Sequence, residues 1–206
     1  MKVYDFEGFP NPARVRIALA EKNLMGKVEF VSVNVPEGEH QSAAFRAKNP
    51  SAAVPMLELD DGTCISECTA ITEYLDNLDG APSLTGKTPR ERAVVHMMQR
   101  RAEAGLLDAV ATYFHHATPG LGADIEGYQC GEWGEHQKQN ALKGMQYLDG
   151  VLADQPYLAG DDFSMADITA FAGLAFADFA EIAVPETCGN LIEWRARVAT
   201  RPSVAG

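Results

Sequence analysis

Three junctions in the first 71 residues place unusual residue types where a helix or strand is expected to begin. The first is Phe9-Pro10-Asn11-Pro12, between a strand-like and a helical segment. The second is Asn49–Pro55, where Val54-Pro55 enters an apolar run, and the third is Ile65–Ile71, which opens a helix at Glu67-Cys68. A helix start leaves backbone N–H groups available to an anion, so the first and third junctions are candidate binding positions, whereas at the second a proline opens a strand.

Other motifs that would indicate a particular chemistry are absent from the sequence. The sequence contains no CxxC, no HxxxH and no glycine-rich phosphate loop. His115 and His116 are adjacent, so on a helix they point about 100° apart and do not share a metal ion. No Ser/His/Asp arrangement is visible along the chain. We therefore predict no metal site and no local nucleophile motif.

The elements that position the junctions follow from hydrophobic periodicity and turn residues. Valine-rich or alternating runs predict strands, and Asp61-Gly62 predicts a hairpin turn. The predicted order is β-α-β-α-β-β-α, that is, a mixed sheet with helices packed on it. The segments are Lys2–Phe6, Pro12–Lys22, Val28–Val35, Ser42–Lys48, Pro55–Leu59, Thr63–Ile65 and Glu67–Leu78.

The sequence predicts only helices after the linker, over residues 89–206. Thr88-Pro89-Arg90-Glu91 is a helix start, and the helix is expected to run to about His116. Ser164 and Asp167 form a second capping box. Further helices are expected around Trp133–Leu152 and Pro185–Thr200. We predict an α/β domain over 1–79, a linker over 80–88 and an all-α domain over 89–206.

Composition excludes several classes. The 206 residues carry a net charge of -12, whereas nucleic-acid binding needs a basic face. No apolar run approaches the ~20 residues that span a bilayer, so no membrane association is expected. Four scattered cysteines are too few for a disulfide scaffold, and we expect a reduced, cytoplasmic location.

The three junctions and the Ser164–Asp167 box, in this order and spacing, resemble the cytosolic glutathione transferase family over essentially the whole chain. The resemblance implies a thioredoxin-like N-terminal domain that binds glutathione as co-substrate, and an all-α C-terminal domain. It also implies a homodimer and a hydrophobic co-substrate held between the domains. Asn11 and Gly38-Glu39-His40 are similar to the Nu-class and fungal regulator-like branches.

By the same resemblance, Glu67 binds the γ-glutamyl ammonium group, and the helix start at Glu67-Cys68 offers N–H groups to the neighbouring carboxylate. Val54, before an expected cis Pro55, pairs with the cysteinyl amide. His40 is a candidate for the glycine carboxylate, and Lys48 is a second cation. Each also has an ordinary structural interpretation, such as a first-turn acid, an edge-strand proline or a solvated histidine.

By its place in the pattern Phe9 is a candidate glutathione-binding residue, but the catalytic corner departs from the family, because many members have Ser or Cys where Phe9 stands. Asn11 is then the candidate catalytic residue: its amide, its backbone N–H and the Ala13 N–H are the donors near the sulfur. Alternatively, Asn11 is only an N-cap, with Pro12 as the first helical residue. Cys68 replaces the usual Ser; we expect it to be buried and unreactive, although a helix N-terminus lowers a thiol pKa.

Three functions remain open. The first is conjugation of glutathione to a small hydrophobic electrophile. The second is glutathione-dependent reduction of disulfides or peroxides, in which glutathione supplies the thiols, and the third is non-catalytic binding. Met98, Tyr113 and Phe114, with Phe9, are candidates for the co-substrate pocket, although aromatic residues at helical spacing also suit a core. The Arg100–Glu103 face is a candidate dimer contact.

Overall fold

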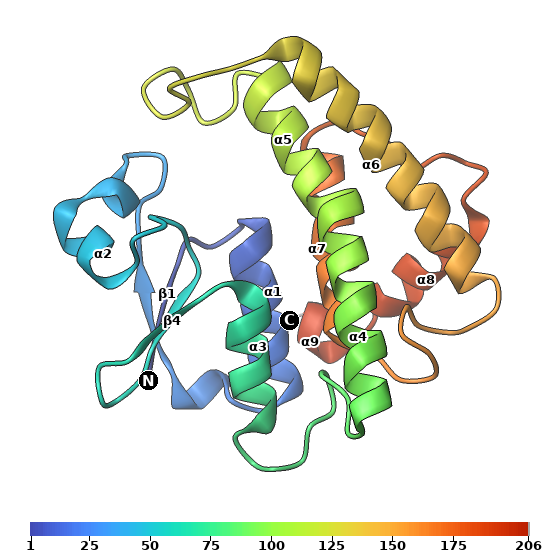
Figure 1. Ribbon diagram of the computed structural model, residues 1–206, viewed down its shortest axis with the longest axis horizontal. Helices are drawn as coiled ribbons and strands as arrows, with labels where there is room; N and C mark the ends of the chain where they lie inside the picture. Colours follow the sequence, from blue (N-terminus) through green and yellow to red (C-terminus); the bar gives the residue numbers. More distant parts are fainter. Residues whose placement is uncertain (206) are drawn as a thin grey trace. The chain divides into compact units, whose positions relative to one another are not determined.

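The computed structural model describes residues 1–205, which fall into two compact units that divide between Pro82 and Ser83. The boundary between the units lies inside the segment predicted as a linker, 80–88. The first unit contains a mixed sheet and the second is helical, as predicted for the fold class (Figure 1).

The sheet of the first unit has four strands in the order β2-β1-β3-β4. β1 runs parallel to β2, whereas β3 is antiparallel to both β1 and β4. The predicted strand over 28–35 is shorter than expected, because Val33 donates a last ladder bond to the Asp5 carbonyl before the chain turns. The elements are β1 (Lys2–Asp5), α1 (Pro10–Glu21), η1 (Met25–Lys27), β2 (Glu29–Ser32), η2 (Glu39–Gln41), α2 (Ala43–Lys48), β3 (Met56–Glu58), β4 (Cys64–Ser66) and α3 (Cys68–Asn77).

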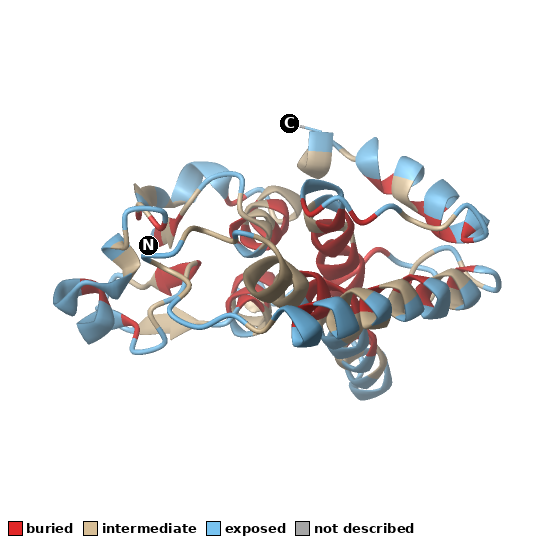
Figure 2. Cartoon of the chain, turned by 90° about the horizontal axis from the view of Figure 1, so that it is seen from above, coloured by how far each residue is buried: buried red, intermediate tan, exposed pale blue. Residues whose placement is uncertain are grey.

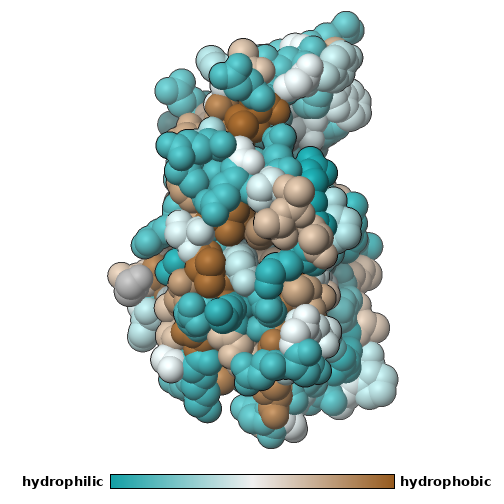
Figure 3. Space-filling view, turned by 90° about the vertical axis from the view of Figure 1, so that its left-hand side faces the viewer, coloured by the Kyte–Doolittle hydropathy of each residue, from teal (hydrophilic) through white to brown (hydrophobic). Residues whose placement is uncertain are grey.

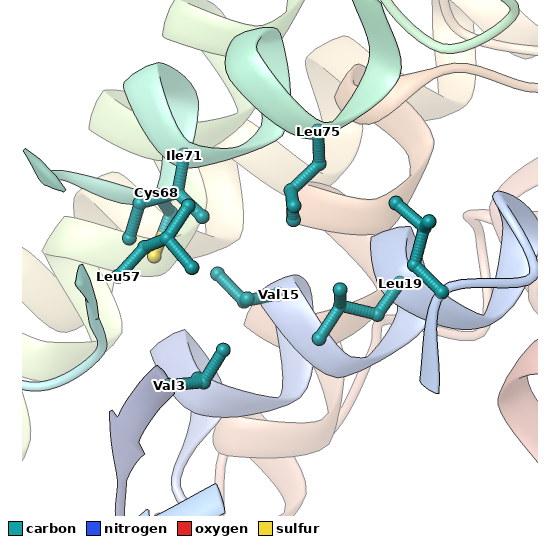
Figure 4. Packing of buried hydrophobic residues seen from close by; sticks show 8 residues of the cluster. Val3, Val15, Leu19, Leu57, Cys68, Ile71 and Leu75 are labelled. Carbon is teal, nitrogen blue, oxygen red and sulfur yellow. The ribbon is translucent and has the colours of Figure 1, made fainter. Parts of the chain in front are cut away.

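Helices cover both faces of this sheet. Side chains alternate along β1, so Val3 and Tyr4 point to opposite faces. Tyr4 meets Phe45 of α2, with ring centroids 6.2 Å apart. On the other face α1 and α3 pack against each other and against the sheet (Figure 1). Their buried side chains converge on one apolar cluster, shown in Figure 4, that includes Val3, Val15, Leu19, Leu57, Cys68, Ile71 and Leu75.

The second unit is built from helices, and among residues 83–205 the only β pairing is an isolated bridge between Tyr157 and Gly160. The helix predicted to end near His116 continues to Ala117, but five residues in its middle, Glu103–Leu107, form a π-helical turn that the sequence did not predict. The elements are α4 (Pro89–Ala102), η3 (Glu103–Leu107), α5 (Asp108–Ala117), α6 (Gly131–Leu152), α7 (Met165–Phe179), α8 (Gly189–Ala199) and α9 (Pro202–Ala205).

Both predicted capping boxes are present. At the start of α4 the Thr88 side chain accepts a hydrogen bond from the Glu91 N–H, and the Glu91 carboxylate accepts one from the Thr88 N–H. At the start of α7, Asp167 is fully buried and accepts from Ser164 N–H at 3.0 Å. It also accepts from Leu158 N–H at 2.9 Å and Trp194 Nε1 at 3.0 Å. Desolvation nevertheless raises the pKa of Asp167 to about 6.

Exposed and buried stripes alternate along the helices, as Figure 2 shows, which is typical of amphipathic helices around a core. The face in Figure 3 is mostly hydrophilic, with apolar side chains scattered in small groups. Within residues 1–205, no helix combines the length and apolar character needed to cross a membrane.

Candidate glutathione site

Strand register brings the three junctions to one edge of the sheet. Tyr4 near the end of β1 pairs with Met56 at the start of β3, and Met56 pairs with Ser66 at the end of β4. The residues just beyond these positions therefore leave the sheet at the same edge. They are the Phe9–Pro12, Val54-Pro55 and Glu67-Cys68 segments that the sequence singled out.

Helix α1 begins two residues earlier than the sequence suggested, at Pro10 rather than at Pro12. Phe9 is its N-cap and Pro10 its first residue, so the interpretation of Asn11 as the N-cap is wrong. Proline at the first helical position has its fixed φ and no N–H to satisfy, which explains this start. The Ala13 N–H donates to the Phe9 carbonyl at 3.0 Å, so it belongs to the helix and is not a free donor.

Asn11 is exposed, and its carboxamide oxygen lies toward the protein. Arg14 Nη1 donates to Asn11 Oδ1 at 2.9 Å. The Cys68 thiol lies 3.4 Å from the Asn11 carbonyl oxygen and 3.7 Å from Oδ1. These contacts join the starts of α1 and α3. Cys68 is buried, as expected, and it faces the candidate catalytic residue.

Phe9 contributes no polar side-chain atom to this corner. Its ring is half-buried and meets Phe6 edge-on, with centroids 4.9 Å apart and planes at 77°. The side chain makes no capping hydrogen bond to α1. The side chain at this corner is therefore an aromatic ring without a hydrogen-bonding group.

The Val54-Pro55 bond is cis, as the family resemblance implied. The preceding loop is held by Asn49, which is buried. Its amide donates to the Ala53 carbonyl at 2.7 Å, and its oxygen accepts from Ser51 Oγ at 2.7 Å. Sequence reasoning assigned Asn49 no role; an asparagine directly after a predicted helix was the available signal.

Glu67 has an unusual backbone. It is the N-cap of α3 with φ 69° and ψ 121°, a region that residues other than glycine rarely adopt. The side chain is exposed and makes no capping hydrogen bond. The helix start therefore keeps its first N–H groups without a side-chain cap, and the carboxylate remains available to a ligand.

The two cationic candidates have different surroundings. His40 lies in η2; its Nδ1 is buried without a hydrogen-bond partner among residues 1–205. Burial, and then the charge of Arg46, lower the pKa of His40. Lys48 instead forms an ion pair with Glu58 at 2.6 Å, and its hydrogen bond to Glu58 raises the Lys48 pKa. The structure thus groups His40 with Arg46, which the sequence analysis did not propose.

The co-substrate candidates in the helical unit do not form one cluster. Met98 is buried, with Tyr147 Oη 3.7 Å from its sulfur. Tyr113 lies beside Lys138, whose Nζ is 4.8 Å from the ring centroid. Phe114 packs with two aromatic residues that the sequence analysis did not name. They are Phe176 and Phe179, at centroid distances of 5.4 Å and 5.7 Å, and Phe179 is 70% exposed.

The described residues, 1–205, contain no group of three or more His, Cys, Asp or Glu side chains that could hold a metal ion.

Comparisons with known proteins agree with this arrangement. A family model for the glutathione S-transferase N-terminal domain matches residues 3–83, and one for the C-terminal domain matches residues 132–202. Glutathione S-transferase 2 of Saccharomyces cerevisiae is 60% identical over 99% of this chain and 88% of that protein. The crystal structure of Gtt2 from the same organism superposes with a TM-score of 0.98 at 60% identity, covering 100% of this chain and 99% of that one.

A glutathione S-transferase domain-containing protein from Marinobacter aquaeolei is equally similar. Its crystal structure gives a TM-score of 0.97 at 61% identity, over 99% of this chain and 100% of that chain. The chain belongs to the glutathione S-transferase family. Its thioredoxin-like N-terminal domain and helical C-terminal domain are those of that family, whose members use glutathione as co-substrate.

Proposed function

We propose that this protein activates the glutathione thiol for attack on a small hydrophobic electrophile, a detoxifying conjugation. The observation that carries the proposal is the convergence of Asn11, Val54-Pro55 and Glu67 on one edge of the sheet. Each of these positions suits a different part of the tripeptide, and their separation follows from the strand register rather than from any single motif.

The γ-glutamyl end binds at the start of α3. The exposed Glu67 carboxylate pairs with the ligand ammonium group, and the Cys68 N–H, at the uncapped helix start, donates to the ligand carboxylate. The Val54 backbone pairs with the cysteinyl amide as an added strand would. These contacts orient the ligand sulfur toward α1.

The glycine carboxylate binds near His40. Arg46 supplies a nearby positive charge, and because Nδ1 of the half-buried His40 is enclosed by the protein, Nε2 is the ring nitrogen left to meet the carboxylate. Lys48 stays a second candidate, although its ion pair with Glu58 would have to open first.

The sulfur is activated by donors at the start of α1. A thiol with a pKa of ~8.5 is only a few per cent ionised at pH 7, and lowering that pKa by ~2 requires about 2.7 kcal/mol. The positive end of a helix dipole and one or two N–H donors supply most of this energy. The Asn11 carboxamide and the Asn11 backbone N–H are the donors, because Pro10 and Pro12 have none.

Reduction of disulfides or peroxides is the alternative function, with bound glutathione and a second glutathione supplying the electrons. The presence of Phe9 and Pro12 where a redox motif would hold cysteines requires glutathione to provide both thiols. A binder without catalysis is the third possibility. We further propose a cytoplasmic homodimer whose co-substrate contacts include Phe114, with Met98 and Tyr113 as further candidates.

The test is a titration of bound glutathione across roughly pH 5 to 9, followed at the thiolate absorbance band. We expect a bound thiol pKa well below the free value. Asn11→Ala should raise it by about 1 to 2 and slow conjugation of a halogenated nitroarene by about 10- to 100-fold. Glutathione binding with an unshifted pKa would contradict activation. Faster turnover with a disulfide or peroxide than with the nitroarene would favour the reductase.

A further inference from the structure

We infer that Arg14 and Cys68 are positioning residues that hold the Asn11 carboxamide in one orientation, with its oxygen inward and its amino group outward. The inference rests on the proposed function, in which the outward amino group donates to the glutathione sulfur. Sequence analysis assigned Arg14 no role and considered Cys68 only for its backbone N–H and its thiol reactivity.

The orientation follows from donor chemistry. A guanidinium group has only donors, so the Asn11 atom that lies 2.9 Å from Arg14 Nη1 must be the oxygen. With Oδ1 turned to Arg14, the two N–H donors of Nδ2 occupy the other side of the carboxamide. Arg14 is buried, with 4% of its surface exposed, so its guanidinium is confined and keeps this geometry.

Cys68 is a second donor to the same residue. Its thiol lies 3.4 Å from the Asn11 carbonyl oxygen and 3.7 Å from Oδ1, and it is fixed within the apolar cluster of Figure 4. A thiol is a weak donor, so its contribution is smaller than that of Arg14. Only the 3.7 Å contact bears on the carboxamide, and there the thiol favours the same orientation as Arg14, because it places a hydrogen against Oδ1; the contact with the backbone carbonyl holds the start of α1 against Cys68.

The orientation matters because a free carboxamide samples a broad, roughly two-fold torsion. With the amino group outward, Asn11 donates to a thiolate; with the oxygen outward, it repels one. The Phe9 ring and two prolines leave this corner without another side-chain donor from residues 9–12. The orientation of this one carboxamide therefore sets whether residues 9–12 add a side-chain donor to the Asn11 backbone N–H and the helix dipole.

A competing explanation is that the Arg14 charge acts on the thiolate directly. The two explanations predict different results for a double-mutant cycle in which the thiol pKa of bound glutathione is measured. If Arg14 acts through Asn11, Arg14→Met raises that pKa in the natural protein but not in the Asn11→Ala background. A direct charge effect raises it in both backgrounds.

We expect Arg14→Met to raise the bound thiol pKa by about 1, and Arg14→Lys, which keeps a charged donor, to restore part of the difference. Cys68→Ala should raise it by less, and Cys68→Ser, which keeps a hydroxyl donor, should not. Glutathione affinity at low pH, where the thiol is neutral in every variant, should change little. A cycle in which the effects add would overturn the inference and leave the proposed function standing.

A measurement on the ligand-free protein tests the positioning role independently of glutathione binding. It therefore remains informative if the proposed function fails. In ¹⁵N-labelled protein free of glutathione, the Asn11 side-chain amide should have the chemical shifts and ¹⁵N relaxation of an ordered group, and in Arg14→Met both should move toward the values of a freely rotating asparagine side chain. Unchanged Asn11 resonances in that variant would refute the positioning role. If the natural protein binds no glutathione or leaves its pKa unshifted, the proposed function fails, and these resonances alone report whether the amide is held.

Discussion

Two helix starts in this molecule use an acidic residue in opposite ways. At the start of α7, Asp167 is fully buried and accepts hydrogen bonds from Leu158, Ser164 and Trp194. At the start of α3, Glu67 is exposed, has a positive φ of 69° and makes no capping hydrogen bond. The first carboxylate is satisfied within the protein, whereas the second is not.

The difference suits Asp167 to a role in stability and Glu67 to the ligand-binding role that we propose. Asp167 links the start of α7 to the preceding loop and to α8, so its hydrogen bonds contribute to the core of the helical unit. The backbone conformation of Glu67 costs of order 1–3 kcal/mol. Its side chain makes no capping hydrogen bond that would offset this cost. A strained residue whose side chain makes no capping hydrogen bond is a candidate for ligand binding, as we propose for Glu67, because a ligand would provide a partner.

Removal of the buried carboxylate should produce the largest effect. We expect Asp167→Ala to lower the free energy of unfolding by about 3 to 5 kcal/mol, since it leaves several buried donors without an acceptor. Urea unfolding measures the loss. Asp167→Asn, which keeps one oxygen, should lose less.

Asp178→Asn is the matched control on the same helix. Asp178 is half exposed and pairs with Arg195, so its loss should cost no more than about 1 kcal/mol. Equal losses for Asp167→Ala and Asp178→Asn would show that the buried network contributes nothing beyond a surface pair. That result would remove the stability half of the comparison.

Glu67 variants should separate strain from binding. We expect Glu67→Ala and Glu67→Gly to weaken S-methylglutathione binding by about 10- to 100-fold, because both lose the charged partner of the ligand ammonium group. Glycine adopts a positive φ without a Cβ clash, so Glu67→Gly should be about 1 kcal/mol more stable than Glu67→Ala. Calorimetric titration and urea unfolding give the two quantities.

Two results would contradict the roles proposed for Glu67 in binding and in backbone strain. Unchanged affinity in both variants would make Glu67 a residue of structure only. Equal stability of the alanine and glycine variants would show that the φ of 69° stores no strain.

Sequence patterns predicted the parts of the fold that depend on local rules. The Thr88–Glu91 and Ser164–Asp167 boxes were predictable because capping depends on residues three apart. The π-helical turn at Glu103–Leu107 was not, because it lies where Gly105 meets Gly144 of α6 and a Cβ on Gly144 would not fit. That contact joins residues far apart in the chain.

The candidate site divides in the same way. Proline and helix-start signals located Asn11, Val54-Pro55 and Glu67, and the cis bond followed from the resemblance. The contacts of Arg14 and Cys68 with Asn11 connect two helices, so no local pattern predicts them. The pairing of Lys48 with Glu58 is likewise tertiary, since α2 and β3 meet only after folding.

His40 provides the smallest and most specific test, because its buried Nδ1 has no hydrogen-bond partner among residues 1–205. Burial lowers the pKa of His40 in the free protein, so the ring is neutral at pH 7. A bound glycine carboxylate favours the charged ring and raises that pKa. The complex then holds more protons than the free protein between the two pKa values, and affinity must fall as pH rises through that interval.

We expect S-methylglutathione, which has no thiol to titrate, to bind several-fold more tightly near pH 5.5 than near pH 7.5, up to about tenfold for a pKa difference of 1. His40→Asn should abolish this slope while leaving the affinity at pH 7.5 nearly unchanged, because the histidine is neutral there. Arg46→Gln should keep a slope, since it removes a charge that lowers the His40 pKa without removing the titrating ring. A slope that persists in His40→Asn would assign the proton uptake to another group and leave the His40–Arg46 pair without a role at the glycine end.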